Sequence, residues 1–363
     1  MSREQCDLAV VLSKEMFYLV PQVNGVVFSL ASFFLVFLFF RNYNFRMYYH
    51  VNFKILLYIH TTACVVLSGA VLTSFSIYLD RVFTKTDCEL LFKTSFCSID
   101  RKIFLTSFLT LTTTQMCIIL ERLYATVKIS TYENTGYILG AVLGTFSVIA
   151  PIIVILITLS KEDPEEVLTQ CLAFTASPSV SDRVYMVFTV QLYVDLSVLV
   201  AFIILYILNK RRIRVGVDQF DGITNNLQIK FQQSENLQVL TEVAPLLIVN
   251  TLVVAVYIGV ARIVKSFQEQ LTLITFKLIL INIFAFPYLS FLLCLTFYLM
   301  VRKSYNNKKA KLKKIANGNL AEEGHIYLKT MAEQWDQGFT NHLARKNDKN
   351  LPQVSEGKSV DKY

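Results

Sequence analysis

The chain has 363 residues, of which 54% are hydrophobic and only 17% are charged. Soluble proteins carry nearer 25% charged residues, so much of this surface must face lipid. The net charge of +8 does not indicate nucleic acid, because 13 of the 35 lysines and arginines follow residue 301 and form a basic tail. Low counts of glycine (12) and proline (7) exclude collagen-like, loop-rich and disordered classes.

Seven apolar segments are each long enough to cross the ~30 Å hydrocarbon core of a bilayer as a helix. The sequence therefore predicts an all-α integral membrane protein with a seven-transmembrane-helix bundle. An N-terminal segment (1–21) precedes the bundle (22–301), and the basic tail (302–363) follows it. In chain order, the predicted helices cover residues 22–40, 55–79, 99–121, 137–159, 184–208, 241–264 and 275–300.

The lysines and arginines beside the helix ends predict the orientation, because cytoplasmic loops are enriched in these residues. With the N-terminus outside, 17 basic residues fall inside and 10 fall outside. The first outer loop, with five basic residues, is the exception. We therefore expect an extracellular N-terminus and a cytoplasmic tail. No inverted repeat relates the two halves, which disfavours a secondary transporter.

Four of the seven cysteines fall on the side predicted to be outside, where oxidising conditions favour disulfides. Cys97, at the start of the third helix, and Cys171, after the fourth, are the natural first pair. Cys6 and Cys88 would form the second pair, although spacing alone does not determine connectivity.

The third helix carries the charged pair Glu121-Arg122 at its inner end. At about 1.5 Å per residue, the 25 steps from Cys97 to Arg122 cover roughly 37 Å, enough to reach both headgroup regions. One interpretation is a charge pair that only stops membrane insertion. The other is functional, because the pair resembles the (D/E)-R-Y position of rhodopsin-like receptors, although Leu123 replaces the tyrosine. That resemblance implies that Arg122 faces a docking G protein.

Polar residues within the spans are candidates for a ligand pocket. Thr106 and Thr110 give the third helix a polar face together with Gln115. Asp195 lies near the middle of the fifth helix, where a charge costs about 2.5–3.5 kcal/mol on insertion scales. It either makes an interhelical hydrogen bond or lines the pocket. Lys277, near the outer end of the seventh helix, either extends to the interface or faces the same pocket.

Two basic stretches flank the predicted inner surface. The first extends the fifth helix, and the second, Arg302 to Lys314, follows the seventh. Each would anchor the protein to anionic lipids or form part of a G-protein footprint. The residues of the first stretch that we assign to coupling, together with Glu121 and Arg122, are Lys210, Arg211, Arg212 and Arg214.

Several motifs in order resemble the nematode serpentine chemoreceptors of the Sra superfamily. The stretches that carry the resemblance are HVNFKILL (50–57), CELLFKTSFC (88–97), ERLYAT (121–126) with TYE (131–133), LQIKFQQSENLQVLTEVAP (227–245) and FPYLSF (286–291). The match runs from about residue 20 to the tail, and class alpha-beta or alpha is favoured over beta or epsilon.

This resemblance implies a GPCR-like chemosensory receptor in the plasma membrane of chemosensory neurons. Its partners would be a small extracellular chemical cue, a heterotrimeric G protein and membrane lipids, with no nucleic acid. The sequence contains no catalytic triad, no paired metal ligands and no cofactor motif, so we expect neither an enzyme nor a bound cofactor. The alternatives are an inverted ligand-gated channel subunit, with its N-terminus inside, and a membrane transporter.

Overall fold

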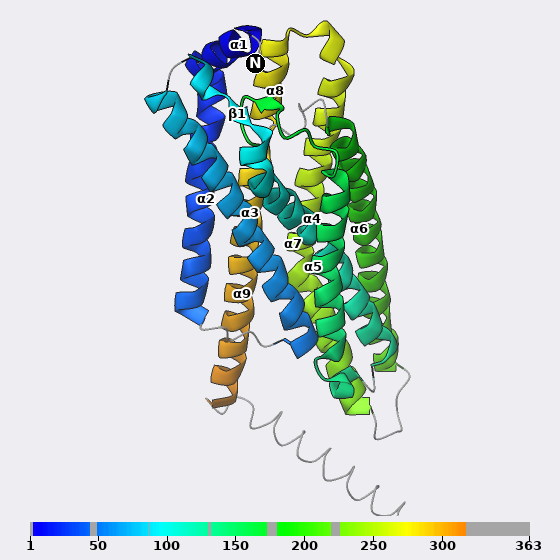
Figure 1. Cartoon of the computed structure of the whole chain (residues 1–363). Coiled ribbons are helices and arrows are strands. Elements are labelled where there is room, and N and C mark those ends of the chain that lie inside the picture. Colours follow the sequence, from blue (N-terminus) through cyan, green and yellow to red (C-terminus); the bar gives the residue numbers. More distant parts are fainter. Residues whose placement is uncertain are drawn as a thin grey trace, which may run out of the picture.

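A computed structural model describes residues 3–43, 49–85, 87–129, 132–172, 180–218 and 226–316. Seven stretches of helix are long and apolar enough to cross a membrane, which confirms the predicted all-α, seven-span fold (Figure 1). Six of these spans belong to one helix each: α2 (Met16–Tyr43), α3 (Val51–Thr84), α4 (Thr94–Val127), α5 (Ile138–Thr158), α6 (Ser181–Asp218) and α7 (Asn226–Ser266).

Helix α4 is the central element of the bundle. It packs against α3, α5, α6 and α7, and 72% of the residues in its most apolar stretch are buried inside the protein. The corresponding figure is 28% for α2, α5 and α6, whose outer faces are apolar and exposed. Because those faces offer no polar groups to water, they are the faces that contact lipid.

The seventh span is broken into two helices, α8 (Leu273–Asn282) and α9 (Phe286–Ala316). A proline lacks the N–H that an interior helical position donates, so it is tolerated mainly in a first turn. Pro287 is the second residue of α9, and the break covers residues 283–285. The sequence predicted one helix over 275–300. The structure divides it and extends α9 past residue 302, so the predicted tail begins within a helix.

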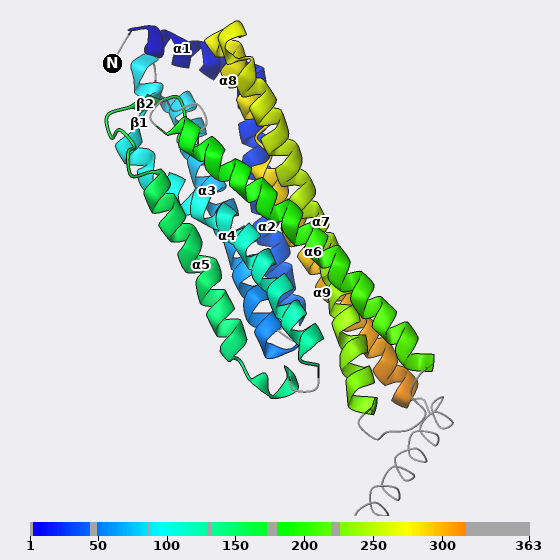
Figure 2. The same cartoon turned by 90° about the vertical axis from the view of Figure 1, so that its right-hand side faces the viewer.

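Short elements close one end of the bundle, which we call the disulfide end. Helix α1 (Arg3–Lys14) crosses this end beside η1 (Asp87–Leu90) and α8 (Figure 2). Strands β1 (Phe92–Lys93) and β2 (Val167–Leu168) form an antiparallel pair with Phe92 opposite Leu168. Another short helix, η4 (Gln268–Gln270), links α7 to α8.

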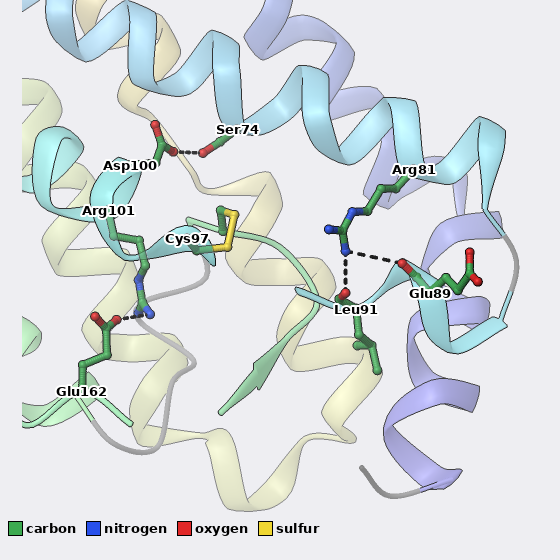
Figure 3. Close-up of a disulfide and its surroundings, with 9 residues drawn as sticks. Ser74, Arg81, Glu89, Leu91, Cys97, Asp100, Arg101 and Glu162 are labelled. Carbon is green, nitrogen blue, oxygen red and sulfur yellow. Dashed lines mark hydrogen bonds and ion pairs between the residues drawn. A yellow bond between two sulfur atoms is a disulfide. The ribbon is translucent and has the colours of Figure 1, made fainter. Parts of the chain in front are cut away.

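Two disulfides hold these elements in place, and they are the two pairings that the sequence favoured. Cys97 at the start of α4 bonds to Cys171 after β2, with Cα atoms 5.0 Å apart, and Cys6 of α1 bonds to Cys88 of η1, with Cα atoms 4.7 Å apart. A buried ion pair between Arg101 and Glu162 ties α4 to the loop that the first disulfide also anchors (Figure 3).

The opposite end of the bundle contains the C-terminal end of α4, the 3-10 helix η2 (Tyr132–Thr135) and the start of α5. Helices α3 and α5 approach closely here. The backbone N–H of Gly140 donates to Asn52 Oδ1 (3.0 Å), and a Cβ atom at Gly140 would lie 2.6 Å from Asn52 Cα. A side chain at this position therefore forces the two backbones apart.

We expect Gly140→Ala to destabilise the bundle by about 1–3 kcal/mol, because the added methyl group overpacks a backbone contact that cannot yield by rotating a side chain. Thermal unfolding of the purified protein in detergent measures the change. Gly259→Ala on α7 is the matched control, since a Cβ atom there has nothing within 4 Å. Equal melting temperatures for the two variants would contradict the close contact.

Candidate functional site

The end of α4 opposite the disulfide carries a buried ion pair. The Arg122 guanidinium donates from Nε and Nη2 to the two carboxylate oxygens of Glu121, each at 2.5 Å. Arg122 is 3% exposed and Glu121 is fully buried. A bidentate pair of this kind fixes both side chains, because two parallel hydrogen bonds specify the plane of each group.

Tyr132 of η2 joins this pair. Its hydroxyl donates to Glu121 Oε1 and accepts from Arg122 Nη2 at 3.0 Å. Burial raises the pKa of Tyr132, and the Glu121 carboxylate adds to the rise while Arg122 opposes it. The phenol therefore stays protonated and keeps its donor. The Arg122 guanidinium also lies 5.0 Å from the centre of the Phe53 ring on α3, within cation–π range.

Helices α6 and α7 are linked to the same arginine through two asparagines. Arg122 Nη1 donates to Asn236 Oδ1 of α7 at 3.2 Å. Asn236 Nδ2 donates to Thr126 Oγ1 at 2.7 Å and to Asn209 Oδ1 of α6 at 3.2 Å. Asn209 Nδ2 also donates to Thr126 Oγ1, at 3.0 Å.

We call this set the Arg122 network; its members are Glu121, Arg122, Thr126, Tyr132, Asn209 and Asn236. It connects α4, η2, α6 and α7 through polar side chains that are each at most 4% exposed. Such groups are costly when left unpaired, so separating any one of these elements requires new partners for the exposed donors and acceptors.

The basic residues predicted for G-protein coupling lie beside this network on α6. Lys210, Arg211 and Arg212 are exposed, and Arg212 Nη1 donates to the Thr126 backbone oxygen at 2.8 Å. Lys210 Nζ lies 5.7 Å from the Tyr206 ring. Arg214 belongs to α6, but its side chain is outside the described part of the chain.

A second polar cluster lies in the middle of the bundle, around Asp195 of α6. Its carboxylate accepts from Thr112 Oγ1 of α4 at 3.3 Å and from Asn250 Nδ2 of α7 at 3.5 Å. Asn250 Nδ2 also donates to Gln115 Oε1 at 3.2 Å, and Gln191 Nε2 donates to Thr112 Oγ1 at 2.9 Å. We call these five residues the Asp195 cluster.

The Asp195 cluster retains unused hydrogen-bonding capacity. Gln115 Nε2, Gln191 Oε1 and Asn250 Oδ1 are buried and have no hydrogen-bond partner among the described residues. Side chains of this type in a bundle interior mark a binding site when a ligand can satisfy them. The cluster therefore holds one donor and two acceptors that a small polar molecule could use.

The structure brings together two of the five residues predicted for the ligand pocket, Gln115 and Asp195. Thr110 is buried, but its hydroxyl donates to the Thr106 backbone oxygen at 2.8 Å within α4, and Thr106 is partly buried. Lys277 is half-buried on α8, which packs against α1, α2 and α7. The Thr110 bond is of a common kind, since threonine hydroxyls on a helix often donate to a backbone oxygen of the preceding turn.

Thr112, which the sequence interpretation passed over, is the threonine that faces Asp195. Its position four residues after Phe108 and three before Gln115 places the three side chains on one face of α4. That spacing is a sequence signal, but Thr113 and Thr114 beside it present the same chemistry. Only the contacts across the bundle distinguish them.

An aromatic cluster, also missed, lies in the disulfide-end half of the bundle. Phe286, at the start of α9, contacts the rings of Phe108, Phe104 and Tyr257, with centroids 4.6, 4.9 and 4.6 Å away. Edge-to-face aromatic pairs of this kind add to the energy of burial. Phe286 also lies near the Phe188 ring of α6, with centroids 6.3 Å apart, so the start of α9 meets α4, α6 and α7.

No group of three or more His, Cys, Asp or Glu side chains that could hold a metal ion occurs in the ranges that the structure describes. The arrangement is suited to binding and to transmitting a shift between helices, since its buried groups are amides, hydroxyls, the Asp195 carboxylate and the Glu121–Arg122 ion pair.

Comparison with known proteins gives consistent matches along the chain. The family model described as "Serpentine type 7TM GPCR receptor class ab chemoreceptor" matches residues 3–336. The chain is similar to serpentine receptor class alpha-39 of Caenorhabditis elegans, with 31% identity over 93% of this chain and 90% of the relative. Serpentine receptor class beta-16 of the same organism is 24% identical over 89% of this chain and 94% of that protein.

We expect Asp195→Asn to leave the melting temperature unchanged or to raise it. The variant keeps an acceptor and loses a buried charge that has no cationic partner among the described residues. Asp195→Leu should cost about 1–3 kcal/mol, because Thr112 and Asn250 lose their acceptor. Equal destabilisation by both changes in a thermal unfolding assay would show that the negative charge itself is required.

Proposed function

This chain belongs to the serpentine class ab chemoreceptors of the nematode Sra superfamily, and on that premise we propose that it binds a small extracellular chemical cue and activates a heterotrimeric G protein. The membership confirms the resemblance carried by the motifs from residue 50 to residue 291. The protein is a multi-pass membrane protein of a GPCR-like chemoreceptor family. Its relatives are named as receptors, which fits a role in binding and signalling rather than catalysis.

The disulfide end is the extracellular end in this proposal. Structural disulfides persist in oxidising compartments, and both disulfides lie at the end that α1 covers. The exposed basic residues of α6 and α9 lie at the opposite end, as short cytoplasmic segments require. This orientation puts the N-terminus outside and the tail in the cytoplasm of a chemosensory neuron, with the receptor in its plasma membrane.

The Arg122 network carries the proposed coupling mechanism. With Arg122 only 3% exposed, its guanidinium cannot contact a partner protein in this arrangement. G-protein engagement requires Asn236 of α7 and Tyr132 of η2 to move away, which opens a cavity beside Lys210, Arg211, Arg212 and Arg214. The bidentate pair with Glu121 would then fix the orientation of the Arg122 guanidinium that the G protein contacts.

The ligand would act through the helices that the Asp195 cluster and the aromatic cluster share. Both clusters contact α4, α6 and α7, the helices that the Arg122 network ties together at the other end. A cue that binds one arrangement of these helices more tightly shifts the population toward it, by no more than the difference in its two affinities. Gln115 and Asp195 are the strongest of the predicted pocket residues. Thr106, Thr110 and Lys277 stay proposals from the sequence.

We expect Asn236→Ala to raise ligand-independent nucleotide exchange several-fold, because it removes the hydrogen bond between α7 and Arg122. The measurement is exchange on purified Gα subunits of several classes, with βγ, normalised to folded receptor. Ser234→Ala is the matched control, since Ser234 is exposed on the same turn of α7 and should have no effect.

The role of Arg122 is tested in that same active background, which needs no identified ligand. Adding Glu121→Gln and Arg122→Gln together should return exchange to the background level. Removing both charges avoids stranding a buried carboxylate, which would cost about 3–5 kcal/mol. A folded triple variant that keeps the raised exchange would show that Arg122 does not contact the G protein.

Epitope tags at residues 1 and 363 test the orientation on intact cells. The receptor proposal requires an accessible tag at residue 1 and a protected tag at residue 363 until the membrane is permeabilised. The reverse pattern would contradict it and favour the inverted channel topology.

A further inference from the structure

A cleft of about 590 Å³ opens between α6 and α7 at the disulfide end, outside both the Asp195 cluster and the Arg122 network. Its volume falls in the range of small-molecule sites. Five residues of α6 and three of α7 line it. Those on α6 are Asp182, Tyr185, Met186, Thr189 and Val190, and those on α7 are Arg262, Lys265 and Ser266.

The cleft contains two cationic side chains, Arg262 and Lys265, and one carboxylate, Asp182. Lys265 pairs with Asp182 across the mouth. Arg262 donates from Nη2 to Thr189 Oγ1 and, at 3.4 Å, to the Tyr185 backbone oxygen. Both of these acceptors are neutral, and Arg262 makes no salt bridge with any carboxylate in the described part of the chain. The cleft therefore has a net charge of about +1 and suits a monoanion.

An unpartnered hydroxyl gives a second, independent indication of a ligand. Tyr185 is only 4% exposed, and its OH has no hydrogen-bond partner among the described residues. Its ring lies 4.4 Å from Lys265 Nζ, so the hydroxyl belongs to a ring already next to the cationic side of the cleft. A buried tyrosine hydroxyl usually finds a partner, and an anionic oxygen in the cleft would supply one.

The position of the cleft selects the source of the anion. The α6 span begins at Ser181 and the α7 span ends at Ser266, so Asp182, Arg262 and Lys265 all lie within about 6 Å of a span end. That depth is the headgroup region of a bilayer, since each span exceeds the ~30 Å hydrocarbon core. Met186 and Val190, one and two turns further into the membrane, are 67% and 55% exposed.

We propose that this cleft binds the phosphate group of a membrane phospholipid in the leaflet at the disulfide end. Arg262 and Lys265 hold the phosphate, the Tyr185 hydroxyl donates to one of its oxygens, and an acyl chain runs along Met186 and Val190. The lipid then bridges α6 and α7, two helices that the Arg122 network also joins at the far end. This site stands whether or not the receptor couples to a G protein.

Native mass spectrometry of the full chain, released from detergent micelles, tests the proposal. The probes are palmitoyl-oleoyl-phosphatidylglycerol, the diacylglycerol with the same chains, and oleate. We expect retention of the phospholipid but not of the diacylglycerol. Arg262→Gln should lower phospholipid retention about tenfold, the size expected for a charged hydrogen bond. Lys102→Gln, a partly buried cation on α4 at the same end, should leave it unchanged.

Tyr185→Phe separates ligand binding from folding. Removing a hydroxyl that lacks a protein partner should leave the melting temperature of the lipid-free protein unchanged or raise it, while phospholipid retention falls about fivefold. Tyr193→Phe is the control, because Tyr193 is 66% exposed on the same helix. Equal retention of the diacylglycerol, or no effect of Arg262→Gln, would overturn the proposal. Arg262-dependent retention of oleate alone would assign the cleft to a free carboxylate and would also overturn it.

Discussion

The buried ion pair of Glu121 and Arg122 is the constraint on which the rest of the structure depends. Two charges removed from water need several partners each, and adjacent residues on one helix cannot supply them. The protein recruits a phenol from η2 and an amide from α7, and that amide is in turn held by Thr126 and Asn209. The need to satisfy one arginine thus determines where four elements meet. An arrangement of this kind has discrete alternatives, because each displaced donor must find another acceptor.

Helix α4 connects this network to the other functional parts of the molecule. Its first turns are clamped by the Cys97–Cys171 disulfide and the Arg101–Glu162 ion pair, so the disulfide end is held to the loop above it. Its middle carries Thr112 and Gln115 in the Asp195 cluster, and its last turns carry Arg122. A shift of α6 or α7 relative to α4 would change the hydrogen bonds of the Arg122 network at the other end of α4.

The break in the seventh span places an aromatic ring of this span in contact with three other helices. Backbone groups between α8 and α9 are not held in a continuous helical ladder, and Phe286 projects from the break into an aromatic cluster shared with α4, α6 and α7. A ligand that displaced this ring would alter contacts on three helices at once. The cleft on the outer side of α6 and α7 offers a separate point of control, because a bridging lipid would hold the same pair of helices from the membrane side.

The sequence by itself determined the number of spans and the class of protein, and it favoured two pairs of cysteines. These follow from local quantities: the length of apolar runs, the charges beside them and the order of short motifs. The sequence also identified Arg122, Gln115 and Asp195 as polar residues in apolar surroundings, because each of them is costly in a membrane. Such costs can be read from composition without knowing any contact.

Only the tertiary structure decided which partners those residues have. Membrane helices are apolar on every side, so hydropathy does not distinguish the face toward lipid from the face toward the bundle. The sequence therefore favoured Thr106 and Thr110, whereas Thr112 is the residue that reaches Asp195 across the interface. The partners Asn209 and Asn236 lie 83 and 110 residues from Thr126, and Phe286 meets rings on α4, α6 and α7. Contacts between residues so far apart depend on how the helices cross, which no local pattern encodes.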